Sequence, residues 1–150
     1  MLADHGIDLG DPDSGVFGFL RALKRGGLSR FRVELFLVIL PADGGSLFPH
    51  TDMEPKAVNI CVSMNRPGEW DAALGGSTDL VWPNDPRNIF SLGTKRLAFD
   101  DVRVLDRVAY TPNQAVIVVK TYNSWHSVGP MECAGSRALR KTVNFNILRH

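Results

Sequence analysis

Two histidines and one aspartate form the part of this chain with the clearest chemical potential. The chain holds four histidines, and two of them, His5 and His150, lie near its ends. His50 and Asp52 are two residues apart, so in extended backbone both side chains project to the same side. Together with the remaining interior histidine, His126, they make two imidazoles and one carboxylate. Such a set binds ferrous iron on one face and leaves the opposite coordination positions open.

Composition favours a soluble globular protein. Of the 150 residues, 44% are hydrophobic and 22% are charged, which argues against a disordered or fibrous chain. The net charge of +1 gives no overall electrostatic attraction to nucleic acid or to an anionic membrane. Two cysteines are too few for a disulfide framework, and no secretory segment or bilayer-length apolar run is present. We therefore expect a cytoplasmic protein without a membrane anchor.

Most of the chain reads as short strands separated by turn residues. In residues 31–39, apolar side chains alternate with charged ones, which predicts a half-buried strand that ends at the turn 41–45. Alternation of the same kind recurs several times along the chain. The further predicted strands are residues 58–64, 78–82, 96–99, 114–120, 122–128 and 139–148, with 105–110 as an eighth candidate.

One segment has a helical pattern. In residues 14–24, the apolar side chains Val16, Phe17, Leu20 and Leu23 fall on one stripe, and two glycines follow. One helix followed by seven or eight strands predicts an all-β protein with minor α content, closed as an antiparallel jelly roll. We expect residues 1–150 to form a single domain.

The two strands nearest the C-terminus have polar faces. In the last strand, Arg140 and Thr142 share a face with two asparagines, opposite an apolar face. His126 lies on the polar face of the strand before it. If these faces point inward, the barrel encloses a cavity for a small polar ligand. The alternative, that they face solvent, is common in antiparallel sheets.

Several motifs resemble one enzyme family. They are GGSLFPHTD (residues 44–52), WDAALGGSTDL (residues 70–80), SWHSV (residues 124–128) and RKTVNF (residues 140–145). In this order they are similar to the 2-oxoglutarate- and Fe(II)-dependent dioxygenases of the prolyl 4-hydroxylase-like branch, over about residues 30–148. The resemblance implies a double-stranded β-helix, the cupin-like jelly-roll barrel, with iron bound by His50, Asp52 and His126.

The resemblance also implies a site for 2-oxoglutarate. A guanidinium can bind both oxygens of a carboxylate, so a buried arginine suits the distal end of this cosubstrate. Arg140 is the preferred candidate, with Thr142 as a hydroxyl donor on the same face. Arg137 is the competing candidate, although its position in a turn favours a solvated charge. Asn59 is a further residue that either contacts the cosubstrate or serves a structural hydrogen bond.

The implied activity is hydroxylation of a C–H bond, with release of succinate and CO2. The partners would be 2-oxoglutarate, dioxygen and an unidentified substrate, either a peptide or a small molecule. Two alternatives stay open. One is a cupin-like isomerase or an oxygenase that does not use 2-oxoglutarate; the other is a metal-binding barrel without activity. Dependence on 2-oxoglutarate separates the first alternative from the dioxygenase.

The chain departs from the family pattern in two places. Relatives often carry a tyrosine on the first strand to reach 2-oxoglutarate, whereas Ile39 and Leu40 occupy that region here. The N-terminal part holds one predicted helix where relatives have several. We therefore expect a domain that is minimal, truncated or strengthened by self-association into a homo-oligomer.

The remaining tryptophans and cysteines have simpler interpretations. Trp70, Trp82 and Trp125 could form a surface that stacks on substrate, but tryptophans in a small β protein more often fill the core. Cys61 and Cys133 have no metal-like spacing and are expected to be structural thiols.

Overall fold

A computed structural model describes residues 31–149 of the chain. Contacts divide the chain into two units, and the account below concerns the unit Val33–Leu148 and the strand ends that continue from it. The described strands are β1 (Phe31–Pro41), β2 (Leu47–Thr51), β3 (Lys56–Ser63), β4 (Thr78–Pro83), β5 (Lys95–Arg96), β6 (Val102–Val108), β7 (Ala115–Val119), β8 (His126–Val128) and β9 (Leu139–Arg149).

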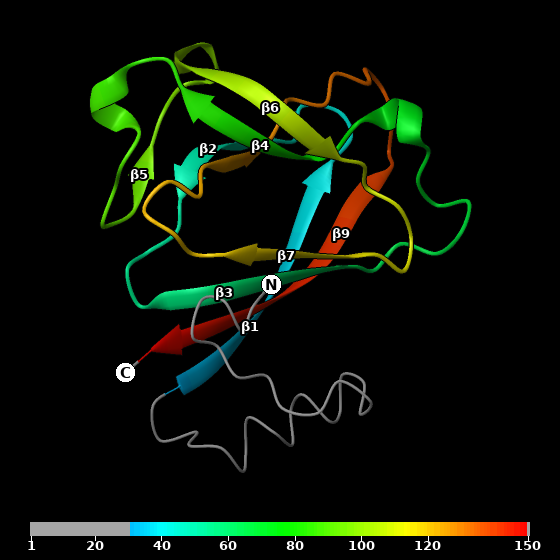
Figure 1. Cartoon of the computed structure of the whole chain (residues 1–150). Helices are drawn as coiled ribbons and strands as arrows, with labels where there is room; N and C mark the ends of the chain where they lie inside the picture. The colour runs from blue at the N-terminus through cyan, green and yellow to red at the C-terminus, as the bar shows by residue number, and fades with distance from the viewer. Residues whose placement is uncertain (1–30, 150) are drawn as a thin grey trace. The chain divides into compact units, whose positions relative to one another are not determined.

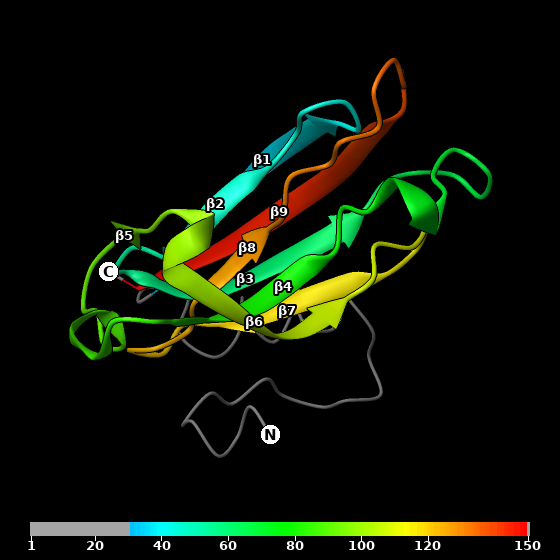
Figure 2. The same cartoon turned by 90° about the horizontal axis from the view of Figure 1, so that it is seen from above.

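The strands form two sheets that face each other, as Figures 1 and 2 show. One sheet has the order β1-β9-β3-β7 and the other has the order β5-β2-β8-β4-β6. The chain therefore passes from one sheet to the other at most of its connections, and the paired strands whose register is defined are all antiparallel. This is a jelly roll, and the predicted all-β fold class is confirmed.

Helical structure in the described part is limited to single 3-10 turns. These are η4 (Ala72–Leu74), η5 (Pro86–Asn88) and η6 (Phe99–Asp101). The helix predicted for residues 14–24 lies outside the described residues. Within residues 31–149, no helix is long and apolar enough to cross a membrane.

Three differences between the observed strands and the sequence patterns have a clear local cause. The predicted strand 122–128 begins only at His126, because the Ser124 hydroxyl closes a turn by donating to the Thr121 carbonyl at 3.1 Å. The predicted strand 96–99 is reduced to the two residues of β5, and a 3-10 turn begins at Phe99. The sequence patterns do not predict β2, since Pro49 lies inside it and proline usually interrupts a paired strand.

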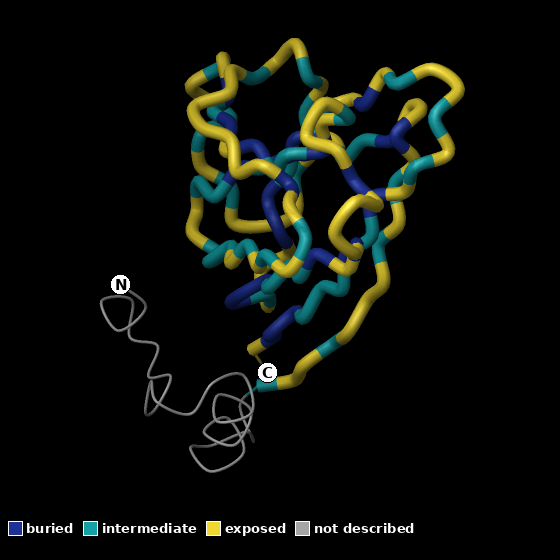
Figure 3. The backbone as a smooth tube through the Cα atoms, turned by 90° about the vertical axis from the view of Figure 1, so that its right-hand side faces the viewer, coloured by how far each residue is buried: buried dark blue, intermediate teal, exposed yellow. Residues whose placement is uncertain are grey.

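The strand β1 is more exposed than its alternating pattern predicts. It is an edge strand, paired only with β9 in its sheet. Leu35 and Leu37 keep 63% and 62% of their accessible surface, so the expectation of a half-buried strand is wrong for these side chains. Figure 3 shows the resulting contrast between exposed and buried stretches of backbone.

The inner face of the β3–β9 pair is polar. Asn59 is opposite Asn146, and Cys61 is opposite Asn144. These residues line a cavity together with Arg140 and others, whereas the apolar side chains of β9 alternate with them. The prediction that the polar face of the last strand lines the barrel interior is confirmed.

A small hydrophobic cluster fills the interior next to Arg140. It consists of Ala42, Trp70, Tyr110 and Met131, all nearly or fully buried. The Trp70 and Tyr110 rings pack edge to face, with centroids 5.5 Å apart. Trp125 is also fully buried. Trp70 and Trp125 therefore belong to the packed interior and not to a stacking surface for substrate.

Candidate metal and cosubstrate site

His50 lies near the end of β2, and Asp52 directly follows that strand. The residue between them, Thr51, is fully buried and points away, where its hydroxyl donates to the Gly93 carbonyl at 2.8 Å and accepts from the Lys95 amide at 3.2 Å. These two bonds tie β2 to the start of β5, the strand that pairs with it. They hold the flanking residues in the extended backbone that places both side chains on one side.

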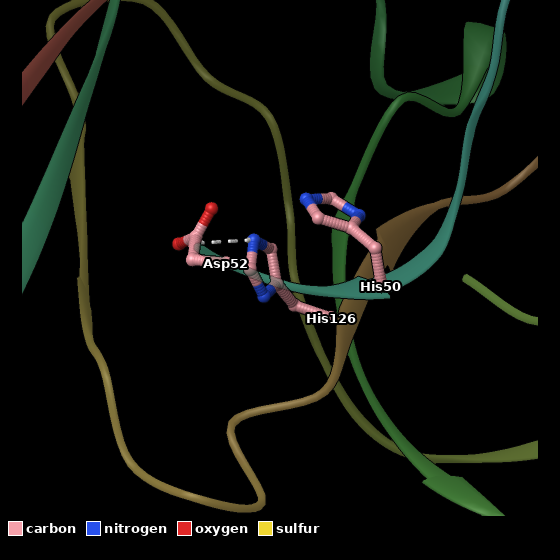
Figure 4. Close-up of side chains that lie close together, drawn as sticks. All are labelled: His50, Asp52 and His126. Atoms are coloured by element: carbon pink, nitrogen blue, oxygen red, sulfur yellow. Dashed lines mark ion pairs between the residues drawn. The ribbon is translucent and has the colours of Figure 1, made fainter. Parts of the chain in front are cut away.

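His126 lies beside His50 because β8 pairs with β2. The two histidines are opposite each other in the register of this antiparallel pair. Their rings are tilted by 51°, and the ring centroids are 4.3 Å apart. Figure 4 shows His50, Asp52 and His126 converging on one region. The structure thus brings together the three residues singled out from the sequence.

Both imidazoles present a free nitrogen to this region. The Nδ1 atom of His50 lies 2.7 Å from the Phe48 carbonyl oxygen, and Nδ1 of His126 lies 3.0 Å from the Ser124 carbonyl oxygen. A carbonyl only accepts hydrogen bonds, so each Nδ1 carries a proton, and Nε2 is the ring nitrogen left to face a metal. Backbone carbonyls orient metal-binding histidines in this way.

Burial keeps His126 in the form that binds metals. Burial and, to a smaller extent, the nearby His50 lower the pKa of His126 from 6.5 to about 4, while Asp52 acts in the opposite direction. The imidazole of His126 is accordingly neutral at neutral pH. It lies 4.0 Å from Asp52, through Nε2 and Oδ2, without a hydrogen bond between them.

One oxygen of the Asp52 carboxylate accepts a hydrogen bond, and the other has no hydrogen-bond partner. Lys56 Nζ donates to Oδ1 at 2.6 Å. Oδ2 is sealed from solvent and has no hydrogen-bond partner. A buried carboxylate oxygen without a partner is costly unless something positive binds it. A cation between Oδ2 and the two imidazole nitrogens would remove that cost.

The donor set fits a transition metal. One ligand atom from each of His50, Asp52 and His126 can be chosen so that all lie within 4.8 Å of one another. Two neutral imidazoles and one carboxylate, all from one side, suit ferrous iron with open positions toward the cavity. His50 and His126 come from two neighbouring strands of one sheet, and Asp52 directly follows one of them.

These residues open onto a cavity of about 620 Å³ between the two sheets. Its charged lining consists of Asp52, Lys56, Arg96 and Arg140, three cations and one carboxylate. The complete lining is Phe36, Leu37, Val38, Ser46, Leu47, Phe48, His50, Asp52, Lys56, Asn59, Cys61, Thr78, Arg96, Val118, His126, Ser127, Val128, Arg140, Thr142, Asn144 and Asn146. Even without the imidazoles, the lining carries an excess of positive charge.

Arg140 is buried at the start of β9, with 4% of its surface exposed. Its Nε donates to the Gly76 carbonyl at 2.7 Å, and its Nη2 lies 3.4 Å from the Thr78 hydroxyl. The guanidinium carbon lies 4.5 Å from the centre of the Tyr110 ring, a cation–π contact. Burial lowers the pKa of Arg140, and the nearby Tyr110 and Cys61 oppose that shift.

No carboxylate in the described part of the chain forms an ion pair with Arg140, although the side chain is almost fully buried. A buried guanidinium of this kind is well suited to an anionic ligand. Thr142 follows two residues later, buried and on the cavity wall. Arg137 is exposed and does not line the cavity, so the geometry favours Arg140 over Arg137 as the carboxylate site.

The turn at Gly75-Gly76 packs against the Arg140 side chain. Gly76 has φ of +76°, and a Cβ there would lie 3.0 Å from Arg140 Cδ and 3.0 Å from a Trp70 ring carbon. Only glycine combines this backbone conformation with such a close approach. The turn predicted from the sequence therefore also positions a functional side chain.

Sequence reasoning did not single out several cavity residues, among them Lys56, Arg96, Asn144 and Asn146. Lys56 gives no motif signal, because its contact with Asp52 depends on the turn in which the Lys56 amide donates to the Met53 carbonyl at 3.1 Å. Asn144 and Asn146 were part of the polar face of the last strand, but nothing singled them out. Cys61 lines the cavity, and burial raises the pKa of its thiol.

Comparison with known proteins finds similarity in structure but not in sequence. No family model matches the sequence, and no curated protein matches it. The crystal structure of a prolyl-4-hydroxylase from Pseudomonas putida superposes with a TM-score of 0.49 and 15% sequence identity. The match covers 99% of this chain and 74% of that one. The chain is similar to that enzyme in structure. The function of the cavity is therefore inferred from the side chains that line it.

Proposed function

We propose that this protein is an Fe(II)- and 2-oxoglutarate-dependent dioxygenase that hydroxylates a C–H bond of a second substrate, releasing succinate and CO2. The observation that carries the proposal is the convergence of two free imidazole nitrogens and an orphan carboxylate oxygen in a cavity that also holds a buried arginine without an ion-pair partner. A structural role explains neither feature, because both leave polar groups buried without full compensation.

His50, Asp52 and His126 would hold the metal. The carbonyls of Phe48 and Ser124 fix the two imidazoles, and Lys56 fixes the carboxylate by occupying its other oxygen. Bound ferrous iron would supply the activation of dioxygen and the oxidation chemistry. The protein contributes ligation from one side, so that the open positions face the cavity.

Arg140 and Thr142 would hold the distal carboxylate of 2-oxoglutarate. The Arg140 side chain is already fixed by Gly76, Thr78 and Tyr110, so little conformational entropy is lost when a carboxylate binds. The guanidinium offers a planar fork to the two oxygens, and the hydroxyl of Thr142 adds a donor. The surrounding barrel excludes bulk water, which strengthens this charge-assisted pair.

Three further statements belong to the proposal. Residues 1–150 form one functional domain. The substrate enters the same cavity together with dioxygen. The two free thiols, Cys61 and Cys133, fit a reducing compartment such as the cytoplasm.

Calorimetric titration of 2-oxoglutarate under argon tests the proposal. We expect binding to protein loaded with Mn(II), a redox-stable stand-in for Fe(II), and at least roughly tenfold weaker binding without metal. A cupin-like enzyme that does not use 2-oxoglutarate would show no such binding. Equal binding with and without metal would contradict the assignment of a joint metal and cosubstrate site.

A further inference from the structure

A second cavity lies beside the first, between the edge strands of the two sheets. It measures about 430 Å³, and its walls come mainly from β4 and β6 of one sheet and from β7 of the other. β6 and β7 are each the last strand of their sheet, and Figures 1 and 2 show them on the same side of the molecule. We call this second cavity the side cleft. Only Thr78, Val118 and His126 line both cavities, so the two meet at a proposed metal ligand.

The side chains of β4 and β6 that face the side cleft are apolar and incompletely covered. Leu80 lies opposite His126 in the β4–β8 pair, so both face the space between the sheets. Val108 likewise lies opposite Thr78, whose hydroxyl contacts Arg140. Leu80 and Val108 nevertheless keep 48% and 40% of their accessible surface. An apolar group placed against them would remove that surface from water, which is favourable.

The opposite wall of the side cleft is apolar too. Val118 of β7 lies opposite Asn59, which lines the first cavity, so both face inward. Val116, two residues earlier on the strand, shares this face and also lines the cleft. Trp82 follows Leu80 by two residues on β4, is half-buried and lines the cleft. Its indole offers a flat surface on which an aromatic ring can pack.

The polar groups around the side cleft already have partners. Asp79 is the only acidic or basic residue besides His126 in its lining. The Asp79 carboxylate accepts a hydrogen bond from the Ser77 hydroxyl and lies 3.5 Å from Arg107. Among the described residues with a sealed, unpartnered side-chain polar atom, none lines the cleft. An ion that entered the cleft would therefore lose its hydration without gaining a partner.

The side cleft adjoins the metal site on the side away from His50. β8 lies between β2 and β4, so His126 has His50 opposite it on one strand and Leu80 opposite it on the other. Neighbouring strands are about 4.8 Å apart. A molecule bound against Leu80 therefore lies next to the metal ligands.

We propose that the side cleft binds the apolar part of the second substrate, an uncharged aromatic ring or aliphatic chain. The carbon to be oxidised then reaches the first cavity beside His126. 2-Oxoglutarate carries two carboxylates and is disfavoured in the uncharged cleft, so it does not compete for this site. The role of the cleft as a substrate site rests on the proposed function, whereas its binding of an apolar group does not.

Three probes that share one ring test the side cleft. Benzyl alcohol is uncharged, benzoate is an anion, and benzylamine is a cation at neutral pH. Each is titrated, with NMR detection, into protein loaded with Zn(II) and saturated with 2-oxoglutarate under argon. We expect benzyl alcohol to bind at millimolar concentrations and at least about threefold more tightly than either ion, because the cleft offers an ion no partner.

Mn(II) locates the bound probe. This ion is paramagnetic and speeds the relaxation of protons close to it, whereas Zn(II) is diamagnetic. The protons of benzyl alcohol should relax faster on Mn(II)-loaded protein than on Zn(II)-loaded protein. The difference should disappear in Asp52→Ala, which lacks a metal ligand.

Replacing Leu80 tests which residues bind the probe. Leu80→Ser should weaken benzyl alcohol about three- to tenfold, because it removes apolar contact, and should leave the affinity for 2-oxoglutarate unchanged. Leu35→Ser is the matched control, since Leu35 is an exposed strand leucine that lines neither cavity. The melting temperature of each variant checks its folding. If Leu80→Ser does not fold, Val108→Thr makes the same test by adding a hydroxyl at nearly constant shape.

Several results would overturn the inference. They are no binding of benzyl alcohol, equally tight binding of benzoate or benzylamine, unchanged affinity in the folded cleft variant, and equal relaxation with Mn(II) and Zn(II). Self-association that Leu80→Ser abolishes, measured by sedimentation, would assign the cleft to a second copy of the chain instead. Failure of 2-oxoglutarate to bind would contradict the proposed function, and the probe titrations on metal-free protein would then still decide the cleft.

Discussion

At the scale of single residues, the site depends on which atoms are already occupied. His50 and His126 each use Nδ1 on a carbonyl, and Asp52 uses Oδ1 on Lys56. Nε2 of each histidine and Oδ2 of Asp52 remain without a hydrogen bond, and these three atoms converge. A chance cluster of polar side chains would be expected to satisfy its own buried groups. Here a buried carboxylate oxygen has no protein partner.

Removing the Asp52 carboxylate should abolish tight metal binding. We expect Asp52→Ala to weaken Fe(II) at least roughly a hundredfold in an anaerobic chelator competition, since loss of an outer-shell partner alone often costs ten- to a hundredfold. Asp52→Asn keeps the size of the side chain and should give a similar loss. Asp85→Ala, at a half-buried carboxylate paired with Arg87 and outside the cavity, is the control. Wild-type affinity in both Asp52 variants would refute the ligand assignment.

Arg140 should determine the affinity for 2-oxoglutarate without affecting the affinity for the metal. We expect Arg140→Ala to raise the dissociation constant of 2-oxoglutarate at least roughly tenfold, because a buried carboxylate would lose its charged partner. Arg140→Lys should rescue only part of the loss, since an ammonium lacks the planar fork. Calorimetry on Mn(II)-loaded protein measures both. An unaffected Arg140→Ala together with a weakened Arg137→Ala would transfer the role to Arg137.

At the scale of elements, the sequence patterns predict most strands but not their partners. Alternation in residues 58–64 and 139–148 identifies β3 and β9, because side chains there follow the two faces of a sheet. The pairing of β2 with β8, which brings His50 opposite His126, joins segments remote in the chain. Local propensity carries no information about such pairing. The resemblance to known motifs supplied what periodicity did not.

The residues that line the cavity were only partly predictable, because strand pairing leaves no local signal in the sequence. His50, Asp52, His126 and Arg140 stand out by residue type and order in the sequence. Lys56 becomes a partner of Asp52 only through a turn. The amides of β3 and β9 become a wall only through strand register. Residues that act through packing against remote strands leave no local signal.

The Gly76 turn offers a test of how an element positions the site. A Cβ at Gly76 would press on Arg140, whereas Gly68 has a similar φ of +84° with no atom within 4 Å of such a Cβ. Both Gly→Ala variants meet the left-handed backbone cost of about 1–2 kcal/mol. We expect only Gly76→Ala to weaken 2-oxoglutarate as well, by about three- to tenfold. Equal affinities in the two variants would show that the turn does not position Arg140.

At the scale of the whole molecule, the jelly roll combines a small packed cluster with a hollow interior. The cluster around Trp70 and Tyr110 supports Arg140, and the cavity occupies much of the space between the sheets. A barrel with buried unpaired polar groups is less stable than a fully packed one. Ligands that satisfy those groups should therefore stabilise the fold.

Metal should raise the melting temperature of the protein. A ligand that binds only the folded state adds about 2.7 kcal/mol at a free concentration of a hundred times its dissociation constant. For a chain of this size we expect an increase of about 5–10 °C with saturating Mn(II). Thermal scans with and without the metal measure it, and Asp52→Ala is the control. A similar increase in Asp52→Ala would place the metal elsewhere.

The most direct measurement is a crystal structure of the protein with Mn(II) and 2-oxoglutarate grown under argon. The metal should be bound by Nε2 of His50, Nε2 of His126 and an oxygen of Asp52. The distal carboxylate should lie within hydrogen-bonding distance of Arg140. Metal bound away from these three residues, or a 2-oxoglutarate carboxylate that does not contact Arg140, would contradict the proposed function.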